Sequence, residues 1–258
     1  MKLPGFLRLT FRNIMVNLDV GTLMFMLGMP GLYLVVLGVM FQGIVPSVSS
    51  SNGSTNYLTF LTPGIVGMQT LTAGSIGAGM LWADRRWGMF EQILVGPFKR
   101  VEYILGIMLL SVIFTLGGGA IMILIALGLS VSLSFTLLNA IILLLSLSVG
   151  AMFFSSLFLI ISLKLKTMNA YNSATIFLFF FLDFASTAFY PVTSKTPYAL
   201  RIFSAMNPLS YIVDISRDTM TYNAPYQALP SLGVITVMMV VFFAIAMYMY
   251  SHLRGSSA

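Results

Sequence analysis

Residues 82–103 read WADRRWGMFEQILVGPFKRVEY, and they interrupt long runs of uncharged, apolar sequence on either side. Both tryptophans of the chain lie in this stretch. It also holds a large share of the few charged residues, namely Asp84, Arg85, Arg86, Glu91, Lys99, Arg100 and Glu102. We therefore interpret residues 82–103 as a polar loop between two buried segments, with a short helix that meets a partner.

The composition of the whole chain is that of a membrane protein. Of its 258 residues, 58% are hydrophobic and 8% are charged, against about 25% charged residues in an ordinary soluble domain. A helix that crosses the hydrocarbon core needs about 20 apolar residues, because each backbone amide must be satisfied within its own helix. The pattern predicts an all-α membrane protein.

We expect one domain, residues 1–258, with six membrane-spanning helices. The predicted spans are residues 20–41, 58–81, 104–129, 136–163, 171–189 and 231–251. Residues 1–19 should form a helix in the membrane interface, because they place apolar side chains on one side and Arg8 and Arg12 on the other. Residues 190–230 should form an outer, re-entrant helical hairpin, whose helices begin at Thr196-Pro197 and Asn207-Pro208.

The distribution of positive charge predicts the orientation. On the side of residues 82–103 we count Lys2, Arg8, Arg12, Arg85, Arg86, Lys99, Arg100, Lys164, Lys166 and Arg254, whereas the other side has Lys195, Arg201 and Arg217. Positive residues favour the cytoplasmic side, so both termini and the loop should be cytoplasmic in a multi-pass protein of the plasma membrane. Because the +6 net charge is dispersed among short loops, it does not indicate nucleic-acid binding.

Within the loop, residues 84–95 can form three helical turns that end at Gly96-Pro97, with Trp87, Phe90 and Leu94 on one face. Arg86 and Glu91 are five residues apart and pair poorly along one helix. At least one should find a partner in the interfacial helix, through Arg8 or Arg12, or in a docked cytoplasmic protein. An ordinary solvated loop is the alternative.

Three features of the spans have both a structural and a functional interpretation. The small residues 73–79 favour packing within the chain over a subunit interface or the lining of a pathway. Asp183 is the only acidic residue well inside a span; water, Lys195 or Arg201 could stabilise it, or it could contact a cationic substrate or relay protons. The aromatic residues of the fifth span could face lipid or line a pathway: Phe177, Phe180, Phe181 and Phe184.

In the second predicted hairpin helix, Asp214, Arg217 and Asp218 stand at spacings of three and four residues. Side chains at these spacings are neighbours on a helix surface. We expect the three to neutralise one another at the outer surface.

Several short motifs occur in an order that resembles one known family. They are Pro63-Gly64 early in the second span, Arg86-x-Gly88-x-x-Glu91 and Pro97-x-x-Arg100 in the loop, and Asn207-Pro208-Leu209-x-Tyr211 in the outer hairpin. Together they look like ABC-2 permeases, the membrane subunits of ATP-binding cassette exporters of drugs, lipids or polysaccharides. The resemblance covers essentially the whole chain. Met89 departs from the pattern, because many relatives have a small polar residue there.

The resemblance implies that the loop is a coupling helix seated on an ATPase subunit, with the contact residues Arg85, Arg86, Trp87, Gly88, Phe90, Glu91, Pro97 and Arg100. It implies that Asn207, Pro208 and Tyr211 organise the outer hairpin. It also implies two permease copies, expected to be a homodimer, with two ATPase subunits and a substrate path between the copies.

The sequence has no G-x-x-x-x-G-K-[ST] phosphate loop, so ATP and Mg²⁺ should bind the partner chain and this chain should be non-catalytic. With one histidine and no cysteine, we expect no cofactor and no metal site. The alternative function is an ion-gradient-driven transporter or a channel, which should use paired ionisable residues near mid-membrane. A membrane enzyme would have few residues to build a site. The strongly apolar predicted spans favour export of a lipophilic compound.

Overall fold

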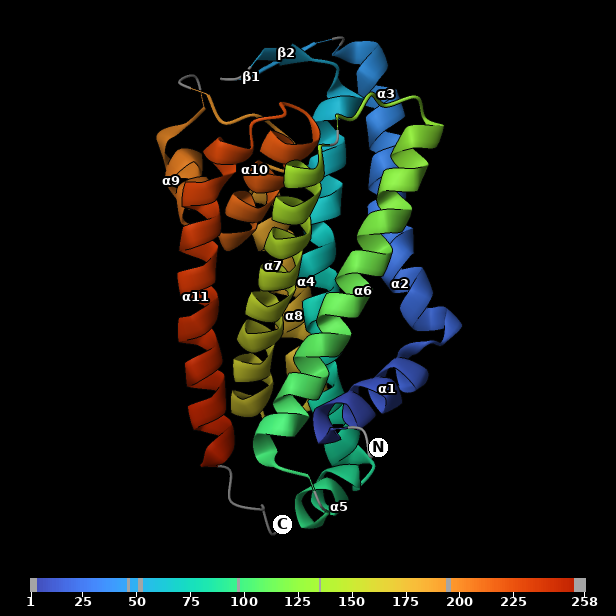
Figure 1. The fold of residues 1–258 in the computed structure, drawn as a ribbon, viewed down its shortest axis with the longest axis vertical. Helices are drawn as coiled ribbons and strands as arrows, with labels where there is room; N and C mark the ends of the chain where they lie inside the picture. The colour runs from blue at the N-terminus through green and yellow to red at the C-terminus, as the bar shows by residue number, and fades with distance from the viewer. Residues whose placement is uncertain are drawn as a thin grey trace.

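The computed structural model describes residues 4–45, 47–50, 53–96, 98–134, 136–193 and 196–252. They form an elongated bundle of helices whose long members run roughly along one axis (Figure 1). The helices are α1 (Gly5–Asn17), α2 (Val20–Leu32), α3 (Gly38–Ile44), α4 (Tyr57–Arg86), α5 (Met89–Val95), α6 (Arg100–Gly128), α7 (Leu137–Lys164), α8 (Met168–Phe184), α9 (Tyr198–Met206), α10 (Pro208–Met220) and α11 (Pro225–Ser251).

Two smaller elements interrupt this pattern. A π-helical segment, Tyr33–Leu37, joins α2 to α3, so the chain stays helical from residue 20 to residue 44. The strands β1 (Val48–Ser50) and β2 (Gly53–Thr55) pair antiparallel. This hairpin was not predicted, because the serine-rich segment gives no alternation of apolar and polar residues.

Helix α4 is the centre of the bundle. It packs against α6, α7 and α10, and it also contacts α2 and α8. Nearly all of its side chains between Tyr57 and Leu81 are buried, including the polar Thr62, Gln69 and Thr70. Thr62 and Thr70 donate to carbonyls of α4 itself, those of Leu58 and Gly67, whereas neither side-chain polar atom of Gln69 has a hydrogen-bond partner among the described residues. A helix packed against other helices does not have to be as apolar as one that faces lipid.

Small residues of α4 allow the close contacts. A Cβ atom added to Gly74 would lie 2.8 Å from the backbone nitrogen of Ser155 in α7. One added to Gly77 would lie 2.1 Å from the hydroxyl of Ser111 in α6. Both distances are too short for a real carbon atom. A side chain at Gly74 would force α4 away from the α7 backbone, and one at Gly77 would displace the Ser111 hydroxyl. The structure thus supports packing within the chain for residues 73–79.

By length and apolar composition, four helical stretches of the described chain could cross a membrane: Val20–Ile44, Arg100–Gly128, Leu137–Lys164 and Pro225–Ser251. They correspond to four of the six predicted spans. The second and fifth predicted spans are also helical, but they do not meet this criterion of length and apolar composition. Helix α4 carries many polar and small residues, and α8 has only 17 residues. The helix of the sixth predicted span, α11, begins at Pro225 and not at residue 231 as predicted.

The two ends of the bundle differ. Helices α1 and α5 and the end of α11 lie at one end, whereas the β hairpin, α3, α9 and α10 lie toward the other (Figure 1). The Arg100 guanidinium, at the start of α6, donates to the Ser251 carbonyl at the end of α11, 2.5 Å away. This contact satisfies a carbonyl that the helix itself leaves without a partner.

The outer segment contains the two short helices that the sequence predicts. Helix α10 begins as expected, with Pro208 in its first turn and Asn207 capping it. Helix α9 begins one residue later than predicted, at Tyr198. The Thr196 hydroxyl does not cap it and instead accepts a hydrogen bond from the Thr193 amide.

Candidate functional site

The predicted helix over residues 84–95 is wrong in one respect, because the structure divides it. Asp84, Arg85 and Arg86 form the last turn of α4. The chain then turns at Trp87 and Gly88, and α5 starts at Met89. Gly88 has a φ of +66°, the left-handed conformation that glycine adopts after the end of many helices. The sequence Arg85-Arg86-Trp87-Gly88 carries a helix-end signal that the prediction missed, because basic residues favour the last turn of a helix and glycine favours the position after its end.

Helix α5 is short and presents several side chains to the outside. It ends at Val95 with Gly96 as its C-cap, as the sequence predicts. Trp87, just before it, is 75% exposed, and Val95 is 90% exposed, whereas Ile93 packs inward. The side chains of Phe90, Glu91 and Leu94, and all of Pro97, lie outside the described residues. Their predicted roles in coupling therefore stay predictions.

The basic residues before α5 lie against the tryptophans. The Arg85 guanidinium is 5.6 Å from the ring centre of Trp82, and that of Arg86 is 5.9 Å from the ring centre of Trp87. Both distances are within the range of a cation–π contact. Partial burial lowers the pKa of Arg85 from its ordinary value.

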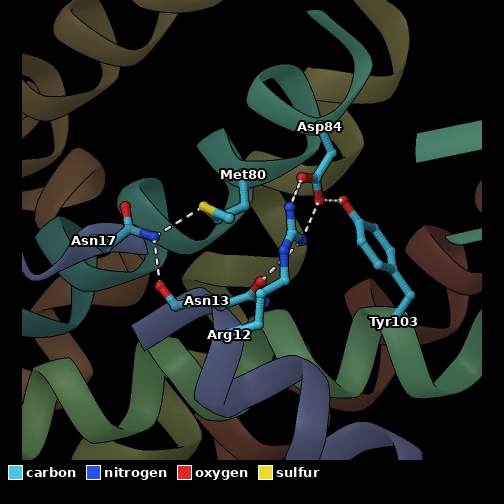
Figure 2. A network of polar contacts seen from close by, with 6 residues as sticks. All are labelled: Arg12, Asn13, Asn17, Met80, Asp84 and Tyr103. Carbon is cyan, nitrogen blue, oxygen red and sulfur yellow. Dashed lines mark hydrogen bonds and ion pairs between the residues drawn. The ribbon is translucent and has the colours of Figure 1, made fainter. Parts of the chain in front are cut away.

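Helix α1 is clamped onto this end of the bundle by a polar network (Figure 2). The Arg12 guanidinium binds both carboxylate oxygens of Asp84; its Nη1 lies 2.9 Å from Oδ2. The Tyr103 hydroxyl, from α6, donates to the same Oδ2 at 2.8 Å. Hydrogen bonding to Asp84 raises the pKa of Arg12 above its ordinary value. Three elements, α1, α4 and α6, therefore meet at one carboxylate.

A second polar contact extends the clamp. The Asn17 side-chain amide donates to the Asn13 carbonyl and to the sulfur of Met80 in α4, both at 2.8 Å. The Tyr103 ring stacks against Tyr250 of α11, with centroids 5.7 Å apart. The end of α4 is thus bonded to α1 and α6, and through Tyr103 of α6 it is connected to α11.

The interfacial helix does reach the charged loop, but through a pair that was not predicted, Arg12 with Asp84. Arg86 lies over the Trp87 ring, and the predicted contact of Glu91 stays a prediction because its side chain lies outside the described residues. Arg8 instead lies over the ring of Phe98, 5.5 Å from its centroid. The apolar side of α1 stays exposed, with Phe11 at 63%, and so does Leu18 just after the helix, at 51%. An amphipathic helix that docks through its polar side and exposes its apolar side fits a membrane interface.

At the other end, the motif residues hold elements together. The Asn207 side chain accepts from the Leu209 amide at 2.9 Å and donates to the Leu182 carbonyl of α8 at 2.7 Å. The Tyr211 hydroxyl donates to the Ala205 carbonyl of α9 at 2.8 Å. Asn207 and Tyr211 therefore join α8, α9 and α10.

Beside them lies a polar cavity of about 560 Å³, whose lining includes Asp214 and Arg217. Arg217 pairs with Asp214 at 3.2 Å and donates to the Thr187 carbonyl at 2.8 Å. The predicted ion pair within α10 is therefore confirmed for Asp214 and Arg217, but Arg217 is buried and not at the surface.

The proposed pathway residues divide into two groups. The phenylalanines lie on the outside of α8 and form stacked pairs, Phe177 with Phe181 and Phe180 with Phe184, at centroid distances of 6.1 and 6.2 Å. Asp183, in contrast, is only 7% exposed. The structure does not bring these residues near the Arg12–Asp84 clamp, because α8 is on a different part of the bundle.

Within the described residues, no group of three or more histidine or acidic side chains could hold a metal ion. A search among curated proteins finds no match. A family model described as "ABC-2 type transporter" matches residues 5–221, from the start of α1 to the end of α10. This match takes in the clamp, α5 and the Asn207 motif, and it covers most of the chain. The chain belongs to the ABC-2 type transporter family.

Proposed function

We propose that this chain receives the force of ATP hydrolysis through α5 and the adjoining end of α4. ABC-2 chains are non-catalytic membrane permease domains of ABC exporters, and the ATPase lies in a separate subunit. ATP and Mg²⁺ would therefore act on the partner, where closure of two ATPase subunits would push on the α5 surface.

The observation that carries the proposal is the clamp at Asp84. The short helix α5, with the exposed Trp87 before it, is joined directly to α4. Asp84, four residues before Gly88, is held from α1 and α6. A push on α5 would therefore reach the central helix through a rigid attachment and not through a loose loop. Because α4 contacts α6, α7 and α10, a tilt of α4 would move most of the bundle.

We further propose six spans, with both termini and α5 in the cytoplasm of the cell. A helix of 30 residues, such as α4, is about 45 Å long, which exceeds the roughly 30 Å hydrocarbon core. The 17 residues of α8 extend about 26 Å, and the irregular residues 185–189 would complete its crossing. Helices α9 and α10 would then form the re-entrant outer hairpin.

Two copies of the chain would form the transport path, as a homodimer with two ATPase subunits. The exposed phenylalanines of α8 support this arrangement, because they give an apolar, aromatic face on which a second copy or a lipophilic substrate could lie. A gradient-driven mechanism receives less support, because the ion pairs described above, Arg12–Asp84 and Arg217–Asp214, join α1 to α4 and two residues within α10, and neither joins two proposed spanning helices.

The test is the charge reversal Glu91→Lys in the complex purified from its native membrane. We expect the wild-type chain to bring with it an ATPase that mass spectrometry identifies as an ABC subunit, and the variant to lose ATP-driven export. The matched control is Lys166→Glu, a reversal in the exposed loop between α7 and α8, which should retain both. Export by Glu91→Lys at the wild-type rate, or purification without any ATPase, would contradict the proposal.

A further inference from the structure

A second cavity, of about 160 Å³, lies between α2, α4 and α8. Its rim consists of side chains on the outside of the bundle: Phe25, Met29, Ile176 and Phe180 are 46–58% exposed. Its inner wall includes Met68 and Thr72 of α4 and Asp183 of α8, each less than 9% exposed. The cavity therefore opens sideways, toward whatever surrounds the bundle, and ends at a carboxyl group.

Among the described residues, no side-chain partner explains the position of Asp183. Its Oδ1 atom is buried without a hydrogen bond in the described part of the chain. The ion pairs of the described residues do not include it. Of the two cations that the sequence suggests as partners, Lys195 lies outside the described residues, and Arg201 donates to the Thr196 carbonyl. An unpaired carboxylate in an apolar interior is costly, so the protein retains a group that a ligand could stabilise.

The other walls of the cavity favour a positive charge. Phe25 and Phe179 line it and contact each other edge to face, with centroids 5.9 Å apart. Tyr33 and Phe180 also line it. Aromatic faces attract cations through their quadrupoles, more strongly where water is excluded. None of the described residues that line the cavity is a lysine or an arginine, so the chain itself does not supply the cation.

We propose that this cavity binds the charged group of a lipophilic organic cation, with Asp183 as the counter-ion and the aromatic rings around it. The inference rests on the proposed function, since it names the class of compound that the permease would export. A cavity of about 150 Å³ holds one benzene-sized group, so only the head of such a compound fits. Its apolar tail would lie along the exposed sides of α2 and α8.

The size and chemistry of the site select the probe. Benzyldodecyldimethylammonium has one aryl ring beside its charge and one alkyl tail. Its carbon isostere, in which carbon replaces the nitrogen, has the same shape without the charge. Binding of both is measured on the purified permease in lipid nanodiscs, with empty nanodiscs as the baseline for partition into lipid.

We expect Asp183→Asn to weaken binding of the cation about tenfold or more, as loss of a charged partner does. Asp183→Glu keeps the charge and should retain most of the affinity. The neutral isostere should bind weakly and equally to all three proteins. Wild-type affinity in Asp183→Asn, or equal affinity of the isostere and the cation for the wild-type chain, would overturn the inference. Gel filtration and the thermal midpoint show that each variant is folded.

The location of binding has its own test, because the chain contains no cysteine. A single cysteine in place of Met29, on the cavity rim, should be protected from N-ethylmaleimide by the cation. A cysteine in place of Met24, which is 69% exposed on the same helix but does not line the cavity, should react at an unchanged rate. Equal protection of both, or of neither, would place the cation elsewhere.

These measurements use the permease without its ATPase, so the two proposals can fail separately. Absence of cation binding in a chain that still purifies with an ABC ATPase would remove the substrate class alone. Cation binding that depends on Asp183, in a chain that brings down no ATPase, would remove the coupling proposal alone.

Discussion

At the scale of single residues, the Arg12–Asp84 pair is the contact that joins α1 to the end of α4 that precedes α5. Its two partners are 72 residues apart, and the acceptor is 2% exposed. An Arg–carboxylate pair with two parallel hydrogen bonds is strong and fixes the orientation of both groups. Since Tyr103 adds a third hydrogen bond to Asp84, the carboxylate holds the ends of α1, α4 and α6 together.

Loss of the guanidinium should therefore cost more than loss of an exposed charge. We expect Arg12→Met to lower the free energy of unfolding by about 2–3 kcal/mol, because it leaves the buried Asp84 carboxylate without its positively charged partner and with the Tyr103 hydroxyl as its remaining donor. Arg8→Met, one turn earlier on α1, removes only a contact with the ring of Phe98 and should cost about 1 kcal/mol or less. The measurement is the unfolding midpoint in detergent micelles. Equal losses in the two variants would show that Asp84 does not need Arg12.

The sequence predicted few of the contact partners of individual residues. Arg12 was predicted to contact the loop, but periodicity along a helix cannot identify a partner so far away in the chain. The capping role of Asn207 was predicted because it depends only on adjacent residues, whereas its bond to the Leu182 carbonyl depends on how α8 packs. The interaction of Arg217 with Thr187 escaped prediction for the same reason.

At the scale of elements, the feature of residues 82–103 that matters most is the break between α4 and α5. Gly88 changes the direction of the chain, so α5 is a separate helix and not a continuation of α4. The sequence predicted the end of α5, because Gly96-Pro97 cannot continue a helix. It did not predict the start, because a glycine within a helix is often tolerated and its left-handed conformation depends on the surrounding fold.

This break can be tested with two glycine substitutions of opposite expected sign. Gly88→Ala should lower the free energy of unfolding by about 1–2 kcal/mol, because alanine is strained at a φ of +66°. Gly117→Ala lies within α6, where an added Cβ meets nothing within 4 Å. It should raise the free energy of unfolding by up to about 1 kcal/mol. Stabilisation by both substitutions would mean that α4 continues through residue 88.

For the central helix α4, the sequence predicted the helix but not how completely it is buried. Its helical character and small-residue run were predicted, and the close contacts of Gly74 and Gly77 agree with that interpretation. Its burial on all sides was not evident, because polar residues such as Gln69 and Thr70 suggest an exposed side. Hydropathy measures compatibility with lipid, and a helix surrounded by other helices does not have to meet that requirement.

At the scale of the whole molecule, the bundle has two chemically different ends (Figure 1). One has the basic residues of α1, α4 and α6 beside α5; the other has the β hairpin, α9 and α10. The positive-charge count predicts that the first end is cytoplasmic. The order and number of helices followed largely from apolar runs, whereas the two-stranded hairpin and the shortness of α8 depend on local packing.

The orientation can be measured on intact cells, because the absence of cysteine makes any introduced thiol unique. We expect Tyr198→Cys, at a position 76% exposed on α9, to react with a membrane-impermeant maleimide added outside. Val95→Cys, at a position 90% exposed on α5, should react only after the cells are opened. Labelling of Val95→Cys in intact cells would reverse the proposed topology.

The central claim is that α5 is the surface on which the ATPase sits, and cross-linking tests it most directly. Gln92→Cys, at an exposed position of α5, is coupled to benzophenone maleimide and irradiated in native membranes, with Tyr198→Cys at the opposite end as the control. We predict a cross-linked product with an ABC ATPase from residue 92 and none from residue 198. No ATPase product from residue 92, or equal yields from both positions, would contradict the account.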